Sequence, residues 1–167
     1  VVWAPQRAIE EAGGRAVAAR TGHAHLKAAL REHDAPYGGE MSAHHYFRDF
    51  AYCDSGVIPA LLVAGLVARA QAPLSAMVGE MRERFPSSGE INFAPDDPQA
   101  ALARFEAAYG AQARDVDRLD GLSMDFGAWR ANLRVSNTEG LLRLNVETRG
   151  DRGLLAAKVA EVSGFLG

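Results

Sequence analysis

The sequence predicts two mixed units, an α/β unit followed by a small α+β unit whose antiparallel sheet carries helices on one face. Three observations support this fold class. Strand-like and helix-like segments alternate in the first half, residues 141–147 alternate apolar with polar side chains, and a Pro-Ser-Ser-Gly run at 86–89 separates the halves. We therefore expect one domain over 1–86 and a second over 87–167.

The first unit is predicted to begin with a helix over residues 5–12. Pro5 fits the first turn of a helix, and Gly13-Gly14 ends it. The elements predicted after it are a strand, a short helix and a second strand, at 15–20, 25–32 and 40–47.

Residues 57–69 give the strongest helix signal in the chain. Apolar residues cover most of the helix circumference, so we expect a buried packing helix, in which Pro59 occupies the first turn. Asp54 and Ser55 precede this helix and are expected to cap its N-terminus. A further helix at 73–85 carries an apolar stripe that is typical of core packing.

The second unit is predicted to combine short strands with two helices. The strands are expected at 90–93, 115–118, 122–124, 129–133 and 141–147, and the helices at 98–112 and 152–165. Leu142, Leu144 and Val146 share one face of the last strand, which is the period-two pattern of a half-buried strand. This order of elements favours an antiparallel sheet with helices on one face.

Composition excludes several classes of function. The 167 residues carry a net charge of -3, so no basic field favours nucleic acid. The longest apolar run, 57–68, is too short to span a bilayer, and the N-terminus shows no signal-peptide pattern. The single cysteine, Cys53, excludes an internal disulfide and is typical of a reducing cytosol. We therefore expect a cytoplasmic protein that binds neither nucleic acid nor membranes.

A polar loop lies between the last two predicted strands. It presents Arg134, Ser136, Asn137 and Thr138, a fixed cation followed by hydroxyls and an amide, and Arg143 just beyond it can add charge. A guanidinium fork binds two oxygens while hydroxyls and turn amides donate to the others, so the loop suits a phosphate. Ser, Asn and Thr are also ordinary turn residues, and a plain hairpin turn is the alternative.

A second polar segment follows Gly38-Gly39. If this segment is extended, Glu40, Ser42 and His44 point to one face. A carboxylate, a hydroxyl and an imidazole on one face suit the adjacent hydroxyls of a sugar ring. A solvated polar strand face is the alternative.

The five histidines raise the question of a metal site. His44 and His45 point to opposite faces of a strand, which makes them a poor ligand pair. No cysteine pair or His-Glu helix spacing supports zinc either. The sequence therefore predicts no metal ligands.

The two polar segments together resemble the α-D-phosphohexomutases, and among them the bacterial phosphomannomutase/phosphoglucomutase branch. The resemblance runs over residues 1–167 and rests on Gly-Glu-Met-Ser-Ala-His at 39–44 and Arg-Val-Ser-Asn-Thr-Glu at 134–139. It implies that the first run contacts sugar hydroxyls and that the second holds the phosphate that is not being transferred. His23, which follows a Thr-Gly turn, then becomes a contact to the substrate or to the transferring phosphate.

Other parts of the family pattern do not occur in this sequence. The family carries a phosphorylatable serine in a Ser-His-Asn-Pro context and binds magnesium through Asp-Gly-Asp-Gly-Asp-Arg, and both runs are absent. The resemblance therefore implies a C-terminal fragment, a truncated third domain plus the fourth, with no catalytic residue and no metal ligand of its own. Gly140 stands where the family usually has proline, which leaves the loop less restrained.

The implied function is interconversion of hexose 1-phosphate and hexose 6-phosphate, of mannose or glucose, through a phosphoserine and a bisphosphorylated sugar. The implied partners are the hexose phosphate and the missing N-terminal domains of the same enzyme, which would bind Mg²⁺. Two alternatives stay open: a non-catalytic sugar-phosphate-binding module, and part of a phosphoglucosamine mutase. Residues 43–49 resemble the phosphomannomutase branch more closely.

Overall fold

The computed structural model describes residues 2–136 and 139–167. Contacts divide the chain into two compact units, called unit 1 (Val1–Val17 with Glu80–Gly167) and unit 2 (Ala18–Gly79). Both units combine helices with antiparallel strands, which confirms the predicted mixed fold class.

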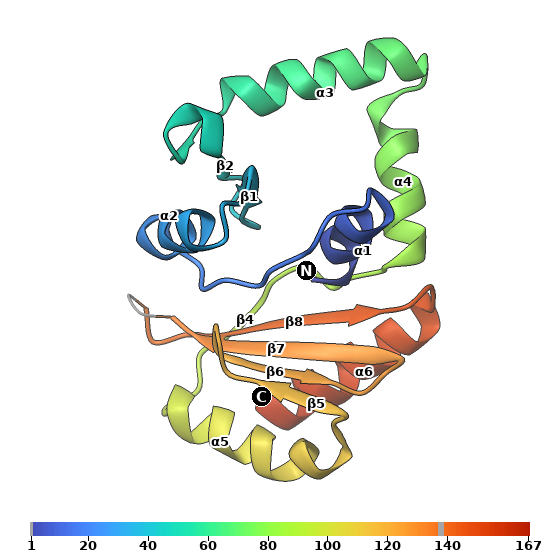
Figure 1. Ribbon diagram of the computed structural model, residues 1–167. Coiled ribbons are helices and arrows are strands. Elements are labelled where there is room, and N and C mark those ends of the chain that lie inside the picture. The colour runs from blue at the N-terminus through green and yellow to red at the C-terminus, as the bar shows by residue number, and fades with distance from the viewer. Residues whose placement is uncertain (1, 137–138) are drawn as a thin grey trace. The chain divides into compact units, whose positions relative to one another are not determined.

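Unit 1 is built on a five-stranded antiparallel sheet with the strand order β4-β8-β7-β6-β5 (Figure 1). The strands are β4 (Ile91–Phe93), β5 (Asp115–Asp117), β6 (Leu122–Asp125), β7 (Trp129–Val135) and β8 (Leu142–Thr148). Two helices cover one face of this sheet, α5 (Pro98–Tyr109), which continues into the 3-10 turn η2 (Gly110–Gln112), and α6 (Arg152–Leu166). The predicted order of strands and helices is thus confirmed for this unit.

The face of the sheet toward α5 and α6 forms the core of unit 1. Leu133, Leu144 and Val146 are fully buried there, in one cluster with Phe105 of α5 and Val162 of α6. Burial of each such side chain contributes about 1.5–3 kcal/mol to stability. The period-two alternation of β8 therefore gives one apolar face, as its sequence predicts, and leaves the other face for polar residues.

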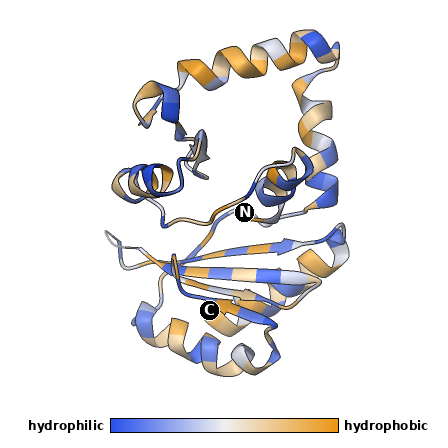
Figure 2. Ribbon diagram, in the orientation of Figure 1, coloured by the Kyte–Doolittle hydropathy of each residue, from blue (hydrophilic) through white to orange (hydrophobic). Residues whose placement is uncertain are grey.

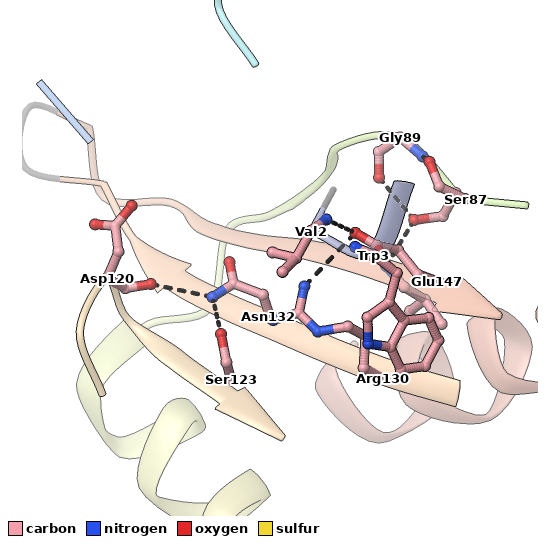
Figure 3. A network of polar contacts seen from close by, with 11 residues as sticks. Val2, Trp3, Ser87, Gly89, Asp120, Ser123, Arg130, Asn132 and Glu147 are labelled. Atoms are coloured by element: carbon pink, nitrogen blue, oxygen red, sulfur yellow. Dashed lines mark hydrogen bonds and ion pairs between the residues drawn. The ribbon is translucent and has the colours of Figure 1, made fainter. Parts of the chain in front are cut away.

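The polar face of the sheet contacts helix α1 (Trp3–Glu11). The carboxylate of Glu147, which is 1% exposed, accepts hydrogen bonds from the amides of Val2 (2.6 Å) and Trp3 (3.2 Å) (Figure 3). Amides at a helix start have no partner within the helix, and a negative charge there is favourable. Arg130 Nη1 lies 3.6 Å from the same carboxylate. Glu147 thereby attaches the start of the chain to the sheet.

Unit 2 combines helix α2 (His23–Glu32) with a small antiparallel sheet of order β1-β2-β3. Its strands are β1 (Tyr37–Gly39), β2 (His45–Phe47) and β3 (Cys53–Asp54), with a 3-10 turn η1 (Arg48–Phe50) after β2. The buried cluster consists of Leu26 and Leu30 of α2 and Tyr46 of β2. This cluster holds α2 against the β1–β2 hairpin, which carries the candidate sugar loop.

Helices α3 (Val57–Ala70) and α4 (Leu74–Arg84) follow β3. α3 is apolar along most of its length (Figure 2), yet none of its residues is buried, and Val57 and Leu61 are each 69% exposed. The prediction of a buried packing helix is therefore wrong for the chain as the structure describes it. α4 likewise has no buried residue, so the core role predicted for its apolar stripe is not seen.

Among the described residues, no single helix has the length and apolar character needed to cross a membrane. The helices α3 and α4 meet that criterion only as a pair, which is bent by 96°.

Two strand predictions in the first half are also wrong. Residues 15–20 form no strand and join neither sheet of the described chain, although their pattern is apolar. Residues 40–47 are not one strand, since 41–43 form the turn of the β1–β2 hairpin and Ala43 adopts a φ of 64°.

The predicted cap of α3 is half correct. Ser55 Oγ accepts a hydrogen bond from the Ile58 amide at 3.2 Å, as an N-terminal capping residue does. The Asp54 carboxylate faces different partners, which belong to the candidate site.

Candidate functional site

The candidate phosphate loop connects β7 to β8. The ladder of the two strands extends into it, because the Ser136 amide donates to the Leu141 carbonyl at 2.8 Å. The Ser136 hydroxyl oxygen accepts a hydrogen bond from the Glu139 amide at 3.1 Å. Ser136 is therefore held in place at the end of the hairpin. Asn137 and Thr138, the other two predicted phosphate ligands, lie outside the described residues.

Two arginines stand opposite each other at the base of this loop. Arg134 of β7 and Arg143 of β8 are direct cross-strand partners, an arrangement in which like charges repel. Three carboxylates lie nearby: Asp120 is 3.9 Å from Arg134, and Glu139 and Glu90 are 3.1 and 3.7 Å from Arg143. An oxyanion between two guanidinium groups would replace their repulsion with attraction.

One hydrogen-bond donor of this arginine pair is unused among the described residues. Nε of Arg143 is buried and makes no hydrogen bond to any residue that the structure describes. The Glu90 carboxylate at 3.7 Å from Nε is too far for a hydrogen bond, so a ligand oxygen that accepts from this buried N–H would stabilise the loop. Arg143, which the sequence reading treats only as added charge, is thus as well placed for an anion as Arg134.

A tight turn between β5 and β6 fixes the backbone beside Arg134. Gly121 has a φ of +78°, and a Cβ at this position would collide with the carbonyl oxygen of Leu133. The Asn132 side-chain amide donates to the Asp120 carbonyl of the same turn at 3.0 Å (Figure 3). The turn therefore lies directly against the strand that carries the candidate phosphate ligand.

The candidate sugar loop is a hairpin turn, and folding rather than strand parity brings its side chains together. The Glu40 amide donates to the His44 carbonyl at 3.0 Å. Ser42 Oγ donates to Glu40 Oε2 at 3.1 Å, and Tyr46 Oη donates to Glu40 Oε1 at 2.8 Å. The carboxylate is thus oriented at both oxygens, and its remaining lone pairs can accept from a ligand hydroxyl.

Tyr46 is a site residue that sequence reasoning missed. Its side chain is fully buried, and burial, the hydrogen bond to Glu40 and the charges of Glu40 and Asp54 raise the pKa of Tyr46. The phenol therefore stays a neutral donor that orients the carboxylate. A tyrosine at an apolar strand position was the available signal, since buried tyrosine hydroxyls usually find a partner.

His23, His44 and Asp54 converge from separate elements of unit 2. Nδ1 of His44 lies 3.3 Å from Asp54 Oδ2, Nδ1 of His23 lies 3.5 Å from Asp54 Oδ1, and Lys27 Nζ is 4.0 Å from Oδ1. The two imidazole rings meet edge to face, with centroids 4.6 Å apart. The fold thus brings the predicted residues His23 and His44 together and adds Asp54 between them.

The ionisation of Asp54 is set by these neighbours. Partial burial works against the charged form, but a backbone hydrogen bond, the His44 contact and the charges of His23 and Lys27 lower the pKa of Asp54 below its ordinary 3.8. Asp54 is therefore an anion that orients both imidazoles.

Comparison with known proteins identifies the family. Residues 2–85 match the family model described as phosphoglucomutase/phosphomannomutase, alpha/beta/alpha domain III, and residues 90–164 match the model of the C-terminal domain. These matches cover most of the chain, which therefore belongs to the phosphoglucomutase/phosphomannomutase family. The resemblance seen in the sequence motifs is confirmed.

Curated relatives are similar over nearly the whole chain but are much longer. Phosphohexose mutases of Xanthomonas campestris pv. campestris are 54% identical over 99% of this chain and 37% of their own length. A phosphomannomutase of Salmonella montevideo is 54% identical over 97% of this chain and 36% of its own length. The chain thus spans little more than a third of these relatives, as expected for the C-terminal domains.

A solved structure of a family member is also similar to this chain. The crystal structure of a phosphoglucomutase/phosphomannomutase family protein from Burkholderia thailandensis matches with a TM-score of 0.77 at 29% identity. The match covers 97% of this chain and 34% of that protein.

Proposed function

We propose that this chain is the substrate-recognition portion of a phosphomannomutase/phosphoglucomutase. The complete enzyme interconverts hexose 1-phosphate and hexose 6-phosphate through a phosphoserine and a bisphosphorylated sugar, and mannose and glucose are both candidate hexoses. The relatives' names and the two family matches support this activity.

The observation that carries the proposal is the facing arginine pair at the β7–β8 loop. Arg134 and Arg143 are cross-strand partners, and the carboxylates of Asp120, Glu90 and Glu139 lie 3.9, 3.7 and 3.1 Å from them. In the proposed enzyme these guanidinium groups, with Ser136, Asn137 and Thr138, hold the phosphate that is not being transferred. Holding it fixes one end of the sugar while the other end reacts, which lowers the entropic part of the barrier.

The sugar contacts are assigned to unit 2. Glu40, oriented by Ser42, accepts hydrogen bonds from ring hydroxyls, and His44 and His23 contact the hexose or the transferring phosphate. These groups touch substrate without forming or breaking a bond, so no catalytic residue is assigned to this chain. Hydroxyls next to one another are present in either orientation of the sugar, which suits an intermediate that must bind both ways round.

The domain boundary is proposed near residue 87, between a sugar-recognition domain at 1–86 and a phosphate-binding domain at 87–167. The two family matches leave a gap at residues 86–89, which supports this boundary. The division by contacts differs because the first residues attach to the sheet through Glu147. Arg149 over the Trp3 ring and the Arg84–Glu11 ion pair add to this attachment, whereas the family matches divide the chain by sequence.

Magnesium belongs to a different part of the proposed enzyme. The family binds it through an Asp-rich run that is absent from this sequence, and the nearby carboxylates of Asp120 and Glu139 already pair with Arg134 and Arg143. The N-terminal domains of the same enzyme are therefore the proposed partners that supply Mg²⁺ and the phosphoserine. A cytoplasmic location is proposed because the one cysteine, Cys53, is a free thiol.

A second candidate is a sugar-phosphate-binding module without catalysis, which the missing serine and magnesium runs favour for the chain as given. Phosphoglucosamine mutase is a third candidate within the family. A titration with glucosamine 1-phosphate beside mannose 1-phosphate separates this third candidate from the proposed activity.

The proposal is tested by an NMR titration of the chain with mannose 1-phosphate, glucose 1-phosphate and inorganic phosphate. All three are expected to shift amides around Arg134 and Arg143, and the sugars should also shift those around Glu40 and His44. Arg134→Ala should weaken phosphate binding at least about tenfold, because a hydrogen bond to a charged group contributes about 1.5–3 kcal/mol.

The matched control is Arg104→Ala, which removes an exposed arginine from α5 on the opposite side of the sheet. Its affinity for phosphate should equal that of the unaltered chain. Equal weakening by both substitutions would show a nonspecific charge effect and would remove Arg134 from the site.

A further inference from the structure

Three side chains of unit 2 that commonly bind metals meet at one point. His23 begins α2, His44 lies at the end of the hairpin turn, and Asp54 belongs to β3. Each offers one ligand atom, and the three atoms all lie within 4.8 Å of one another. The geometry points to a binding site for a divalent transition metal here, with Zn²⁺ as the ion that fits best.

The separations agree with a zinc coordination sphere. Bonds of about 2.0–2.2 Å in a tetrahedral site place neighbouring ligand atoms about 3.3–3.6 Å apart. His44 Nδ1 lies 3.3 Å from Asp54 Oδ2 and His23 Nδ1 lies 3.5 Å from Asp54 Oδ1, while one ligand atom from each of the three residues falls within 4.8 Å of the others. Little side-chain movement is therefore needed to bring all three ligands onto one ion.

The donor set selects the class of metal. Two imidazoles and one carboxylate suit Zn²⁺, Co²⁺ or Ni²⁺, whereas Mg²⁺ prefers oxygen ligands alone. Three protein ligands also leave the fourth tetrahedral position open for water or a ligand oxygen. This site therefore differs in chemistry from the magnesium loop that the family carries elsewhere.

The scaffold holds the ligands in place. Tyr46 pairs with Asp54 across β2 and β3, and the buried contact of Tyr46 with Leu26 and Leu30 fixes α2 beside the strands. Side chains on such packed elements lose little freedom when a metal binds, so affinity is preserved.

One neighbouring cation opposes metal binding at this cluster. Imidazole and thiol groups elsewhere in unit 2 are alternative metal ligands. Lys27 Nζ lies 4.0 Å from Asp54 and must move away from an incoming cation. His45 is engaged elsewhere, with Nδ1 at 2.6 Å from the Tyr37 hydroxyl. The free thiol of Cys53 is the remaining ligand type that a test must separate from the cluster.

The test is a calorimetric titration of the untagged chain with Zn²⁺, together with Co²⁺ absorption spectra that report tetrahedral coordination. One equivalent is expected to bind. His23→Gln, His44→Gln and Asp54→Asn should each weaken binding at least about tenfold. His25→Gln and Cys53→Ser are the controls and should bind as the unaltered chain does.

Circular dichroism of each variant shows whether it is folded, and unfolding is unexpected because His23 is exposed and His44 is only partly buried. The inference is overturned if the folded chain takes up no Zn²⁺, if the three substitutions leave affinity unchanged, or if Cys53→Ser abolishes binding.

A competition experiment with a sugar phosphate also tests the site, and its expected result rests on the proposed function. If His23 and His44 contact the sugar phosphate, mannose 1-phosphate and Zn²⁺ should exclude each other, and the apparent affinity for Zn²⁺ should fall as the sugar phosphate is added. If Zn²⁺ binding depends on His23, His44 and Asp54 but mannose 1-phosphate does not weaken it, the metal site is upheld. The assignment of the two histidines to the sugar is then refuted.

Discussion

Glu40 and Asp54 show how the neighbours of a carboxylate decide its role. The Glu40 carboxylate accepts hydrogen bonds from the hydroxyls of Ser42 and Tyr46. These bonds orient it to accept further hydrogen bonds from neutral groups of a ligand. Asp54 instead faces imidazoles and the ammonium of Lys27, so it serves as a counter-charge. Two carboxylates of similar intrinsic chemistry therefore have different roles in unit 2, Glu40 as a hydrogen-bond acceptor and Asp54 as a counter-charge.

The surroundings of Asp54 predict an acid-shifted titration. Since its folded-state pKa lies below the ordinary 3.8, Asp54 stabilises the fold above that pH, and the contribution is lost as the pH falls through the folded-state pKa. NMR of the carboxyl carbon should show a midpoint below 3.8. His44→Ala should raise this midpoint, because it removes one of the groups that favour the carboxylate.

His33→Ala is the matched control, since His33 lies at the end of α2 and is not part of the cluster. The midpoint of Asp54 should be the same in this variant as in the unaltered chain. A midpoint that does not move in His44→Ala would mean that the His44 contact is absent in solution.

At the scale of elements, the sequence predicts best where local pattern and tertiary pairing agree. The alternation in β8 specifies one buried face, and the partner strand β7 is its neighbour along the chain, so pattern alone suffices. The turn at 41–43 escapes prediction because Ala43 takes the left-handed conformation without a glycine or proline to signal it.

The prediction that helix α3 is buried is wrong for a different reason. Its apolar composition predicts burial, yet none of its residues is buried, because a sequence pattern does not say which surface covers a helix. The candidate site shows the same limit: Asp54 reads as a helix cap from its position, and only the fold places it between His23 and His44.

The β5–β6 turn gives a prediction that joins stability to binding. Gly121→Ala should destabilise unit 1 by at least about 1–2 kcal/mol, because alanine is strained at a positive φ. The new Cβ would also displace Leu133 and Arg134, so phosphate affinity should fall. Urea unfolding and the phosphate titration measure the two effects.

Gly164→Ala is the matched substitution, since Gly164 lies in the last turn of α6 and a Cβ there meets open space. It should leave phosphate affinity unchanged and slightly increase stability. Similar losses for both variants would contradict the special role of the β5–β6 turn.

At the scale of the whole molecule, the two units differ in how much they bury. The core of unit 1 joins strands β6, β7 and β8 to α5 and α6, whereas among the described residues the buried cluster of unit 2 consists of Leu26, Leu30 and Tyr46. Segments with few buried contacts open at low free energy. The candidate phosphate loop therefore lies on the more stable scaffold, and the candidate sugar loop on the less stable one.

Amide hydrogen exchange should resolve this difference directly. Amides of β7 and β8 should exchange only through global unfolding of unit 1, while those of α3 should exchange far faster, because its exposed apolar residues leave the helix little tertiary support. Exchange is measured at several protein concentrations, so that self-association through α3 is detected as slowing with concentration. Equal protection of α3 and β8 in dilute monomer would contradict the prediction, since it would require a covering surface for α3 within the chain itself.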